Sequence, residues 1–210
     1  MCGRLRAVPK LRVGVLVSHH GSNLRALHQA SLKPGAQFTV CAAISNNSRS
    51  AGLAYARDNA IPTQHLSGKT HLDPDYLDEA IRTMLVAHSV DWVITAGYLK
   101  KLGPQTLRQF SPRILNIHPA LLPRHGGVGM YGLNVHRAVL AAGDRISGPS
   151  IHLVEGEYDT GRVLAQLEVP VLPKDTADSL AARVLEAEHT LLPRVVQQIA
   201  ATGQPPHTPG

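Results

Sequence analysis

Two polar side chains, Asn116 and His118, lie at alternate positions in the short apolar run from Ile114 to Pro119. In a β-strand, alternate side chains point to one face, so the amide and the imidazole are expected to lie side by side. Pro119 cannot donate to a strand ladder, so the strand should end there. Because open α/β sheets bind ligands at the carboxyl ends of their strands, the pattern predicts a hydrogen-bond donor and a proton carrier at a ligand site. The structural alternative is an interior Asn and His satisfied by backbone hydrogen bonds.

A loop at residues 18–23 lies between a predicted strand and a predicted helix. Free N–H groups and the helix dipole favour a phosphate at such a helix start. Gly21 permits close backbone approach, while Ser22 and Asn23 add side-chain donors. The spacing matches neither a P-loop nor a dinucleotide fingerprint, so nucleotide binding is not implied. The alternative is an ordinary turn in which Ser or Asn caps the helix.

An acidic loop at residues 155–161 lies between two late predicted strands. As a structural feature it is a solvated hairpin turn, in which Asp-x-Gly is common. As a functional feature it brings Asp159 against His118, where a carboxylate raises the pKa of an imidazole and fixes its orientation.

The elements that position these groups alternate along the chain. Strands are expected over 12–17, 38–44, 63–66, 92–96 and 114–118, and helices over 24–30, 51–59, 75–88, 104–110 and 135–142. Residues 150–154 and 163–171 are expected to form an antiparallel pair. Asp175 or Thr176 should cap a last helix that runs to about Ala200 and kinks at Pro193. The order predicts an open, mainly parallel twisted α/β sheet flanked by helices, with a late antiparallel hairpin.

Composition favours one domain over residues 1–210, with disordered ends at about 1–10 and 203–210. The net charge is +6, but Lys and Arg are scattered and only 4% of residues are aromatic, which favours an anionic metabolite over nucleic acid. No apolar stretch reaches the ~18 residues of a membrane span. Cys2 and Cys41 are expected to be free thiols in a reducing cytoplasm. No His/Cys spacing matches a zinc site, so His19 and His20 are interpreted as loop residues.

The ordered segments VLVSHHGSNLRAL, AAISNN, TAGYLKKLGP, ILNIHPALLP, EYDTG and ARVLEAEH resemble the phosphoribosylglycinamide formyltransferases, folate-dependent transformylases of purine synthesis. The resemblance covers roughly residues 12–200. It implies a 10-formyltetrahydrofolate donor, a phosphoribosylglycinamide acceptor and no metal. It also implies small-molecule partners without nucleic acid or membrane, a cytoplasmic location and a monomer or homodimer.

The resemblance implies a role for each matching position. The catalytic set is Asn116, His118 and Asp159, and the phosphate loop is Gly21, Ser22 and Asn23. Glu188 would contact the glycinamide end. The folate pocket would be lined by Leu99, Lys100, Lys101, Leu102, Glu155, Gly156, Glu157 and Tyr158.

These residue types suit formyl transfer. The acceptor amine attacks the formyl carbon, and Asn116 and a protonated His118 donate hydrogen bonds to the developing oxyanion. His118 also moves the proton from the amine toward folate N10, and Asp159 keeps the imidazole charged.

Four features depart from the family pattern. His19 replaces the first Gly of the usual S-G-x-G-S-N, either as a cation near the phosphate or at a solvent edge. Ala120 replaces a Ser, and residues 124–132 form a longer Gly-rich loop that is either a lid or a floppy insertion. Residues 69–75 contain no Arg to match the one that some members place near folate.

Three other functions are compatible with parts of this pattern. A formyltetrahydrofolate hydrolase normally carries an extra N-terminal domain, and a methionyl-tRNA formyltransferase an extra C-terminal domain; neither is expected here. A non-catalytic folate or phosphosugar binder would not need Asn116, His118 and Asp159 together.

Overall fold

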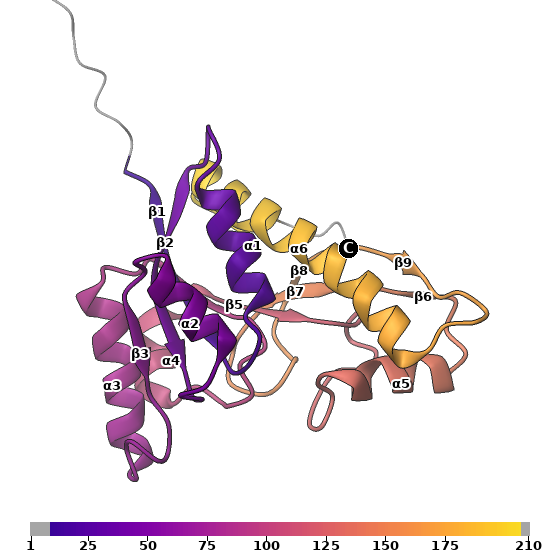
Figure 1. Cartoon of the computed structure of the whole chain (residues 1–210), viewed down its shortest axis with the longest axis horizontal. Helices are drawn as coiled ribbons and strands as arrows, with labels where there is room; N and C mark the ends of the chain where they lie inside the picture. Colours follow the sequence, from indigo (N-terminus) through magenta and orange to yellow (C-terminus); the bar gives the residue numbers. More distant parts are fainter. Residues whose placement is uncertain (1–8, 207–210) are drawn as a thin grey trace, which may run out of the picture.

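The computed structural model describes residues 9–206 and has a seven-stranded sheet at its centre (Figure 1). The strand order is β3-β2-β1-β4-β5-β7-β8. The first five strands in the chain are mutually parallel: β1 (Leu11–Val17), β2 (Phe38–Ser45), β3 (Thr63–His65), β4 (Trp92–Thr95) and β5 (Ile114–His118). Two antiparallel strands extend this sheet beyond β5, namely β7 (Ser150–Leu153) and β8 (Val163–Gln166). The predicted fold class is confirmed.

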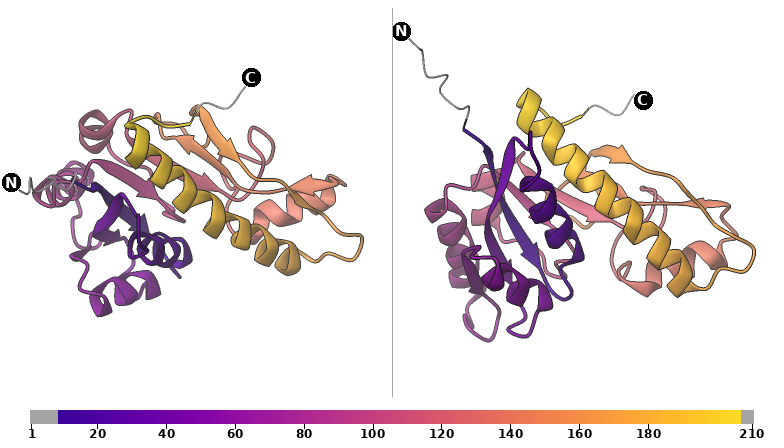
Figure 2. Two further views of the ribbon diagram at one scale, coloured as in Figure 1. Left: turned by 90° about the horizontal axis from the view of Figure 1, so that it is seen from above. Right: turned by 45° about the horizontal axis from the view of Figure 1, so that its top comes forward.

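Helices cover both faces of the sheet. The first face carries α1 (Ser22–Ser31), α2 (Ala51–Asp58) and the long α6 (Ala177–Thr202), and the second carries α3 (Pro74–Ala87) and α4 (Pro104–Phe110). In both views of Figure 2, α6 lies along the sheet beside α1. A smaller apolar cluster joins α5 (Leu133–Ala141) to α6. Within residues 9–206, no helix combines the length and apolar character needed to cross a membrane.

The helix starts follow local capping chemistry. Asp73 caps α3 through its side chain, and Pro74 occupies the first helical turn, where no N–H is needed. Thr176, not Asp175, caps α6 in a reciprocal box with Ser179. The helix continues across Pro193, and the kink predicted there stays a prediction.

The late strands differ from the prediction. The expected strand at residues 163–171 divides into β8 and a separate β9 (Val169–Pro170), which pairs with β6 (Ile146–Ser147) in a second sheet. Pro170 has no N–H to donate, so it is favoured only at the edge of a sheet, where few ladder hydrogen bonds are needed. The segment accordingly pairs only with the two-residue strand β6. The predicted disordered ends fall largely on residues 1–8 and 207–210, which lie outside the described residues. Gly203, which is among the described residues, is the C-cap of α6.

Candidate active site

A cavity of about 1180 Å³ opens where β1, β4 and β5 end. Ligand pockets usually measure about 300–1,000 Å³, so this cavity is somewhat larger than the usual site for one small ligand. Most residues predicted for the site line it: Gly21, Ser22, Asn23, Leu99, Lys100, Lys101, Leu102, Asn116, His118, Gly156, Glu157, Tyr158, Asp159 and Glu188. Glu155 is exposed and is not part of this lining.

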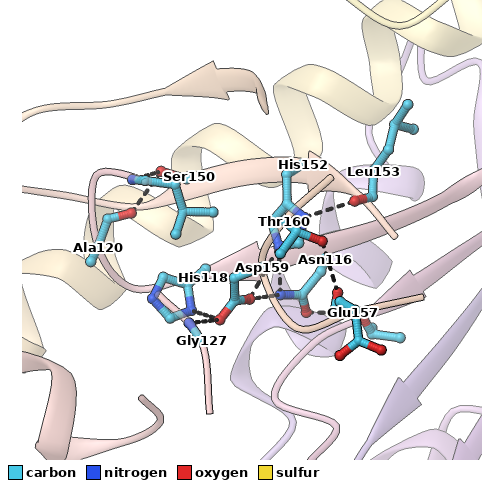
Figure 3. Close-up of polar contacts among 12 residues, drawn as sticks. Asn116, His118, Ala120, Gly127, Ser150, His152, Leu153, Glu157, Asp159 and Thr160 are labelled. Carbon is cyan, nitrogen blue, oxygen red and sulfur yellow. Dashed lines mark hydrogen bonds and ion pairs between the residues drawn. The ribbon is translucent and has the colours of Figure 1, made fainter. Parts of the chain in front are cut away.

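The side chains of Asn116, His118 and Asp159 meet at the end of β5 (Figure 3). Nδ1 of His118 lies 3.4 Å from Oδ2 of Asp159, and Nδ2 of Asn116 lies 3.4 Å from Oδ1 of the same carboxylate. The period-2 spacing of β5 puts the amide and the imidazole on one face, and the loop after β7 supplies the carboxylate. All three line the cavity, and His118 and Asp159 are nearly enclosed by protein.

The contacts of His118 define which ring nitrogen can exchange a proton. Nε2 lies 2.8 Å from the backbone carbonyl of His125, and a carbonyl only accepts, so Nε2 carries a hydrogen. In the neutral ring, Nδ1 is then the unprotonated atom, and it faces Asp159. Burial lowers the pKa of His118, and the opposing charge of Asp159 does not fully offset that effect. Asp159 does raise the pKa of the imidazole, as expected, but burial outweighs that effect and the net pKa is lowered, so Asp159 does not by itself keep the ring charged. The pattern of residues did not reveal how deeply the ring is buried.

Asp159 is held as a carboxylate by several groups. Burial acts to raise its pKa, but hydrogen bonding with His152, the charge of His118 and the N–H of Gly127 together hold the pKa below its ordinary value. The Gly127 N–H donates to Oδ2 over 3.0 Å. Asp159 also has a positive φ of 56°, a conformation that non-glycine residues rarely adopt and that is often found at functional sites.

Two further side chains support Asn116 and were missed by the sequence analysis. His152 lies directly opposite Asn116 in the β5–β7 ladder, and its Nε2 is 3.0 Å from Nδ2 of Asn116 and 3.3 Å from Oδ1 of Asp159. Its Nδ1 donates to the carbonyl of Leu153 over 2.8 Å, so Nε2 accepts from Asn116 in the neutral ring and donates to Asp159 when the ring is protonated. Thr95, paired with Asn116 across β4 and β5, donates to Oδ1 of Asn116 over 2.8 Å. Finding them required the register of the sheet, which alternation within one strand does not give.

The loop before α1 leaves the start of that helix without a side-chain cap. Gly21 occupies the N-cap with φ 69°, and no side chain hydrogen-bonds there, so the expected alternative of a Ser or Asn cap is wrong. The backbone of Gly21 packs so closely on Gly52 that a Cβ at Gly21 would lie 2.4 Å from the Gly52 Cα. Ser50 and Gly52 both donate to the carbonyl of His19, which fixes the loop against α2. The first turn of α1 therefore presents its N–H groups to the cavity, as an anion site requires.

Glu188, on α6, lies beside the start of α1. Its carboxylate accepts a hydrogen bond of 2.7 Å from Nδ2 of Asn23. Burial raises the pKa of Glu188 to about 7, against the smaller, opposing effect of the Asn23 bond. The group can accept a hydrogen bond from, or share a proton with, a ligand amine near neutral pH.

Two loops bound the other side of the cavity. The hydroxyl of Ser18 accepts from the N–H of Leu99 over 2.9 Å and so holds the start of the loop at residues 99–102. Lys101 forms an ion pair of 2.8 Å with Glu157, and its ammonium lies 5.1 Å from the centre of the Tyr158 ring. These contacts join the two loops that the resemblance places around folate.

The departures from the family pattern have distinct settings. His19 is exposed and lines the cavity. Ala120 is fully buried, and its backbone carbonyl accepts a hydrogen bond of 2.6 Å from the Ser150 hydroxyl (Figure 3). The Gly-rich loop lines the cavity from Gly127 to Gly132. Its backbone contacts both His118 and Asp159, so the loop adjoins the candidate catalytic residues.

Comparison with known proteins gives the family. Residues 11–196 match the family described as formyl transferase. The "phosphoribosylglycinamide formyltransferase, chloroplastic" of Vigna unguiculata is 46% identical over 193 residues, which make up 91% of this chain and 62% of that protein. Two crystal structures of phosphoribosylglycinamide formyltransferases are also similar. The one from Anaplasma phagocytophilum has 40% sequence identity and a TM-score of 0.81, over 91% of this chain and 87% of that chain. The one from Brucella melitensis has 39% sequence identity and a TM-score of 0.84, over 91% of this chain and 96% of that chain. This chain belongs to the formyl transferase family.

Proposed function

We propose that this protein transfers the formyl group of 10-formyltetrahydrofolate to the amine of 5'-phosphoribosylglycinamide in purine biosynthesis. The relatives support the acceptor and the reaction by name, although the chain spans 62% of the length of the Vigna protein. The observation that carries the proposal is the meeting of Asn116, His118 and Asp159 inside a cavity of about 1180 Å³.

The cavity offers a different environment to each part of the two substrates. The acceptor phosphate would bind at the uncapped start of α1, through Gly21, Ser22 and Asn23. The glycinamide end would reach Glu188, which adjoins Asn23. The folate ring would lie against the apolar side chains of the opposite loops, near Leu99 and Leu102.

The geometry supports a direct transfer in which His118 acts first as a base. The acceptor nitrogen bonds to the formyl carbon, and the carbonyl electron pair moves to the formyl oxygen. Unprotonated Nδ1 of His118, whose pKa is lowered by burial, takes a proton from the amine, and the resulting imidazolium is stabilised beside Asp159. Collapse of the tetrahedral intermediate breaks the bond from the formyl carbon to N10, and His118 returns the proton to N10.

Asn116 supplies the hydrogen bond to the oxyanion. One of its N–H groups is directed at His152, and the other has only the 3.4 Å contact with Asp159, so it is available to the formyl oxygen. Loss of one oxyanion donor typically costs ~10²–10³ in rate. His152 and Thr95 hold the amide in this orientation.

The test is a spectrophotometric assay of deformylated folate formed with and without phosphoribosylglycinamide. The proposal predicts product only when the acceptor is present, and loss of nearly all turnover in His118→Asn. Product formed equally without acceptor would indicate a hydrolase, and ligand binding without turnover would indicate a binding protein. Either result would replace the proposed function.

We also propose small molecules as the partners, a monomer or homodimer as the assembly and a reducing compartment as the location. Cys41 is a buried free thiol, and Cys2 lies outside the described residues. Size-exclusion chromatography with light scattering and thiol titration of the native protein test the assembly and the redox state.

A further inference from the structure

A backbone carbonyl of the Gly-rich loop, rather than a side chain, is the hydrogen-bond partner of Nε2 of His118. Nε2 of His118 donates to the carbonyl of His125 over 2.8 Å. Two residues later, the N–H of Gly127 donates to Asp159 over 3.0 Å. One short segment of loop therefore contacts both members of the His118–Asp159 pair, and its position sets their geometry.

That segment is anchored by a pair of side chains outside the cavity lining, His125 and Asp144, which we call the clamp. Nε2 of His125 lies 2.7 Å from Oδ2 of Asp144, and both side chains are largely buried. Asp144 lies just beyond the end of α5, and Arg124, which is mostly exposed, contacts its other oxygen. His125 has a positive φ of 54°, where glycine is the usual residue. The side-chain bond to Asp144 gives a reason for a histidine there.

We propose that Asp144 and His125 are positioning residues: they fix the His125 carbonyl so that His118 keeps its hydrogen on Nε2 and presents an unprotonated Nδ1 to the reaction. The inference rests on the proposed function for its catalytic consequence. If the clamp is released, the Nε2–H loses its acceptor, while Asp159, 3.4 Å from Nδ1, could accept a hydrogen bond from a hydrogen on that nitrogen. The tautomer with the hydrogen on Nδ1 then becomes favourable, and that ring cannot take a proton from the amine at Nδ1.

Other titratable groups around His118 do not compete for Nε2. Asp159 faces Nδ1, and His152 on β7 and His125 in the Gly-rich loop act on the ring through their charge. The charge of His118 in turn lowers the pKa of His136 on α5. The described contacts of His118 give Nε2 one acceptor, the carbonyl of His125. The tautomer therefore depends on where that carbonyl is held.

Two variants release the clamp by different routes. Asp144→Ala removes the anchor, and His125→Gly keeps the backbone carbonyl, tolerates the positive φ and removes the side chain that ties it down. The matched control is Asp175→Ala, because Asp175 is also a largely buried carboxylate paired with an arginine, Arg183, but does not line the cavity. All three should lose some stability, so stability alone does not distinguish positioning from packing.

The distinguishing readouts are the tautomer of His118 and the split between kcat and KM. ¹⁵N NMR of histidine-labelled protein, above the pH where the ring is charged, separates hydrogen-bearing from unprotonated nitrogens; the His118 signals are assigned by their loss in His118→Gln. The wild type and Asp175→Ala should show the hydrogen on Nε2. Asp144→Ala and His125→Gly should shift it toward Nδ1 and lower kcat by about tenfold or more, with KM changed less than threefold.

An unchanged tautomer in folded Asp144→Ala and His125→Gly overturns the proposal, and so does a shifted tautomer with unchanged kcat. The NMR measurement needs no substrate. A wild type without formyl transfer would therefore refute the proposed function, while the tautomer shift would still report whether the clamp positions His118.

Discussion

Replacing Glu188 with glutamine is expected to remove a pH dependence of stability that the buried carboxyl imposes. Glu188 lies on α6 with 7% of its surface exposed, and burial raises its pKa from 4.5 to about 7. The unfolded chain therefore releases this proton at lower pH than the folded protein does. The stabilising effect of the retained proton is full below about pH 4.5 and is lost as pH rises toward and through 7.

The size of the effect follows from the same two values. A difference between 4.5 and about 7 corresponds to about 3 kcal/mol of folding free energy across the titration. Glu188→Gln keeps the shape and an acceptor for Asn23 but cannot ionise. The free energy of unfolding of Glu188→Gln, minus that of the wild type, should therefore rise by about 3 kcal/mol between pH 4 and pH 8.

The assay is urea unfolding at a series of pH values, with the variant and the wild type measured in the same buffers so that other titrating groups cancel. Glu186→Gln, at an exposed position on the same helix, is the control and should differ from the wild type by less than about 0.5 kcal/mol at every pH. A Glu188→Gln difference that stays flat from pH 4 to pH 8 would refute the inference that burial shifts this carboxyl.

Three further predictions address the rest of the cavity. Gly21→Ala should lower the free energy of unfolding by about 2 kcal/mol or more and weaken acceptor binding, because the new Cβ would lie 2.4 Å from the Gly52 Cα. The control Gly35→Ala, at a positive φ in open space, should lower the free energy of unfolding by only about 1 kcal/mol. Equal losses in the two variants would contradict the packing argument. Burial lowers the pKa of His118, and the neutral ring is the base, so kcat should stay constant as pH falls to about 6.5 and should decline only below the lowered pKa. A decline in kcat that begins above pH 7 would be inconsistent with this assignment. Lys101→Met should change the free energy of unfolding by less than about 1 kcal/mol, since the ion pair of Lys101 with Glu157 is exposed. The same variant should raise KM for the folate and make that KM less dependent on salt. An unchanged KM would exclude Lys101 from the donor site.

The features predicted correctly from sequence are those set by short-range periodicity. Alternation placed Asn116 and His118 on one face of β5, and the order of strands and helices gave the sheet class. The acidic loop made Asp159 a candidate partner of His118, and the resemblance favoured that interpretation over a solvated turn; the 43 positions between Asn116 and Asp159 put the pair beyond any local pattern.

The features that sequence did not give depend on register and burial. His152 was missed because its role follows from its position opposite Asn116 in an antiparallel ladder. The effect of Asp159 in raising the pKa of His118 was predicted, but the larger, opposite effect of burial was not, because a motif can indicate a charge partner and cannot indicate the loss of solvent around a ring. The structural alternative for the loop before α1 was a Ser or Asn cap, since such side chains often cap helices, yet Gly21 occupies the N-cap and packs closely against Gly52.

The central claim is that the imidazole of His118, the carboxylate of Asp159 and the amide of Asn116 act together on a formyl carbon. The most direct test follows ¹³C-labelled formyl from the folate donor to the acceptor by NMR in the wild type and in Asp159→Asn. The account predicts transfer of the label to the acceptor amide in the wild type, and a rate at least ~10²-fold lower in the folded variant. Label that moves at a near-normal rate in Asp159→Asn, or that appears as free formate in the wild type, would contradict it.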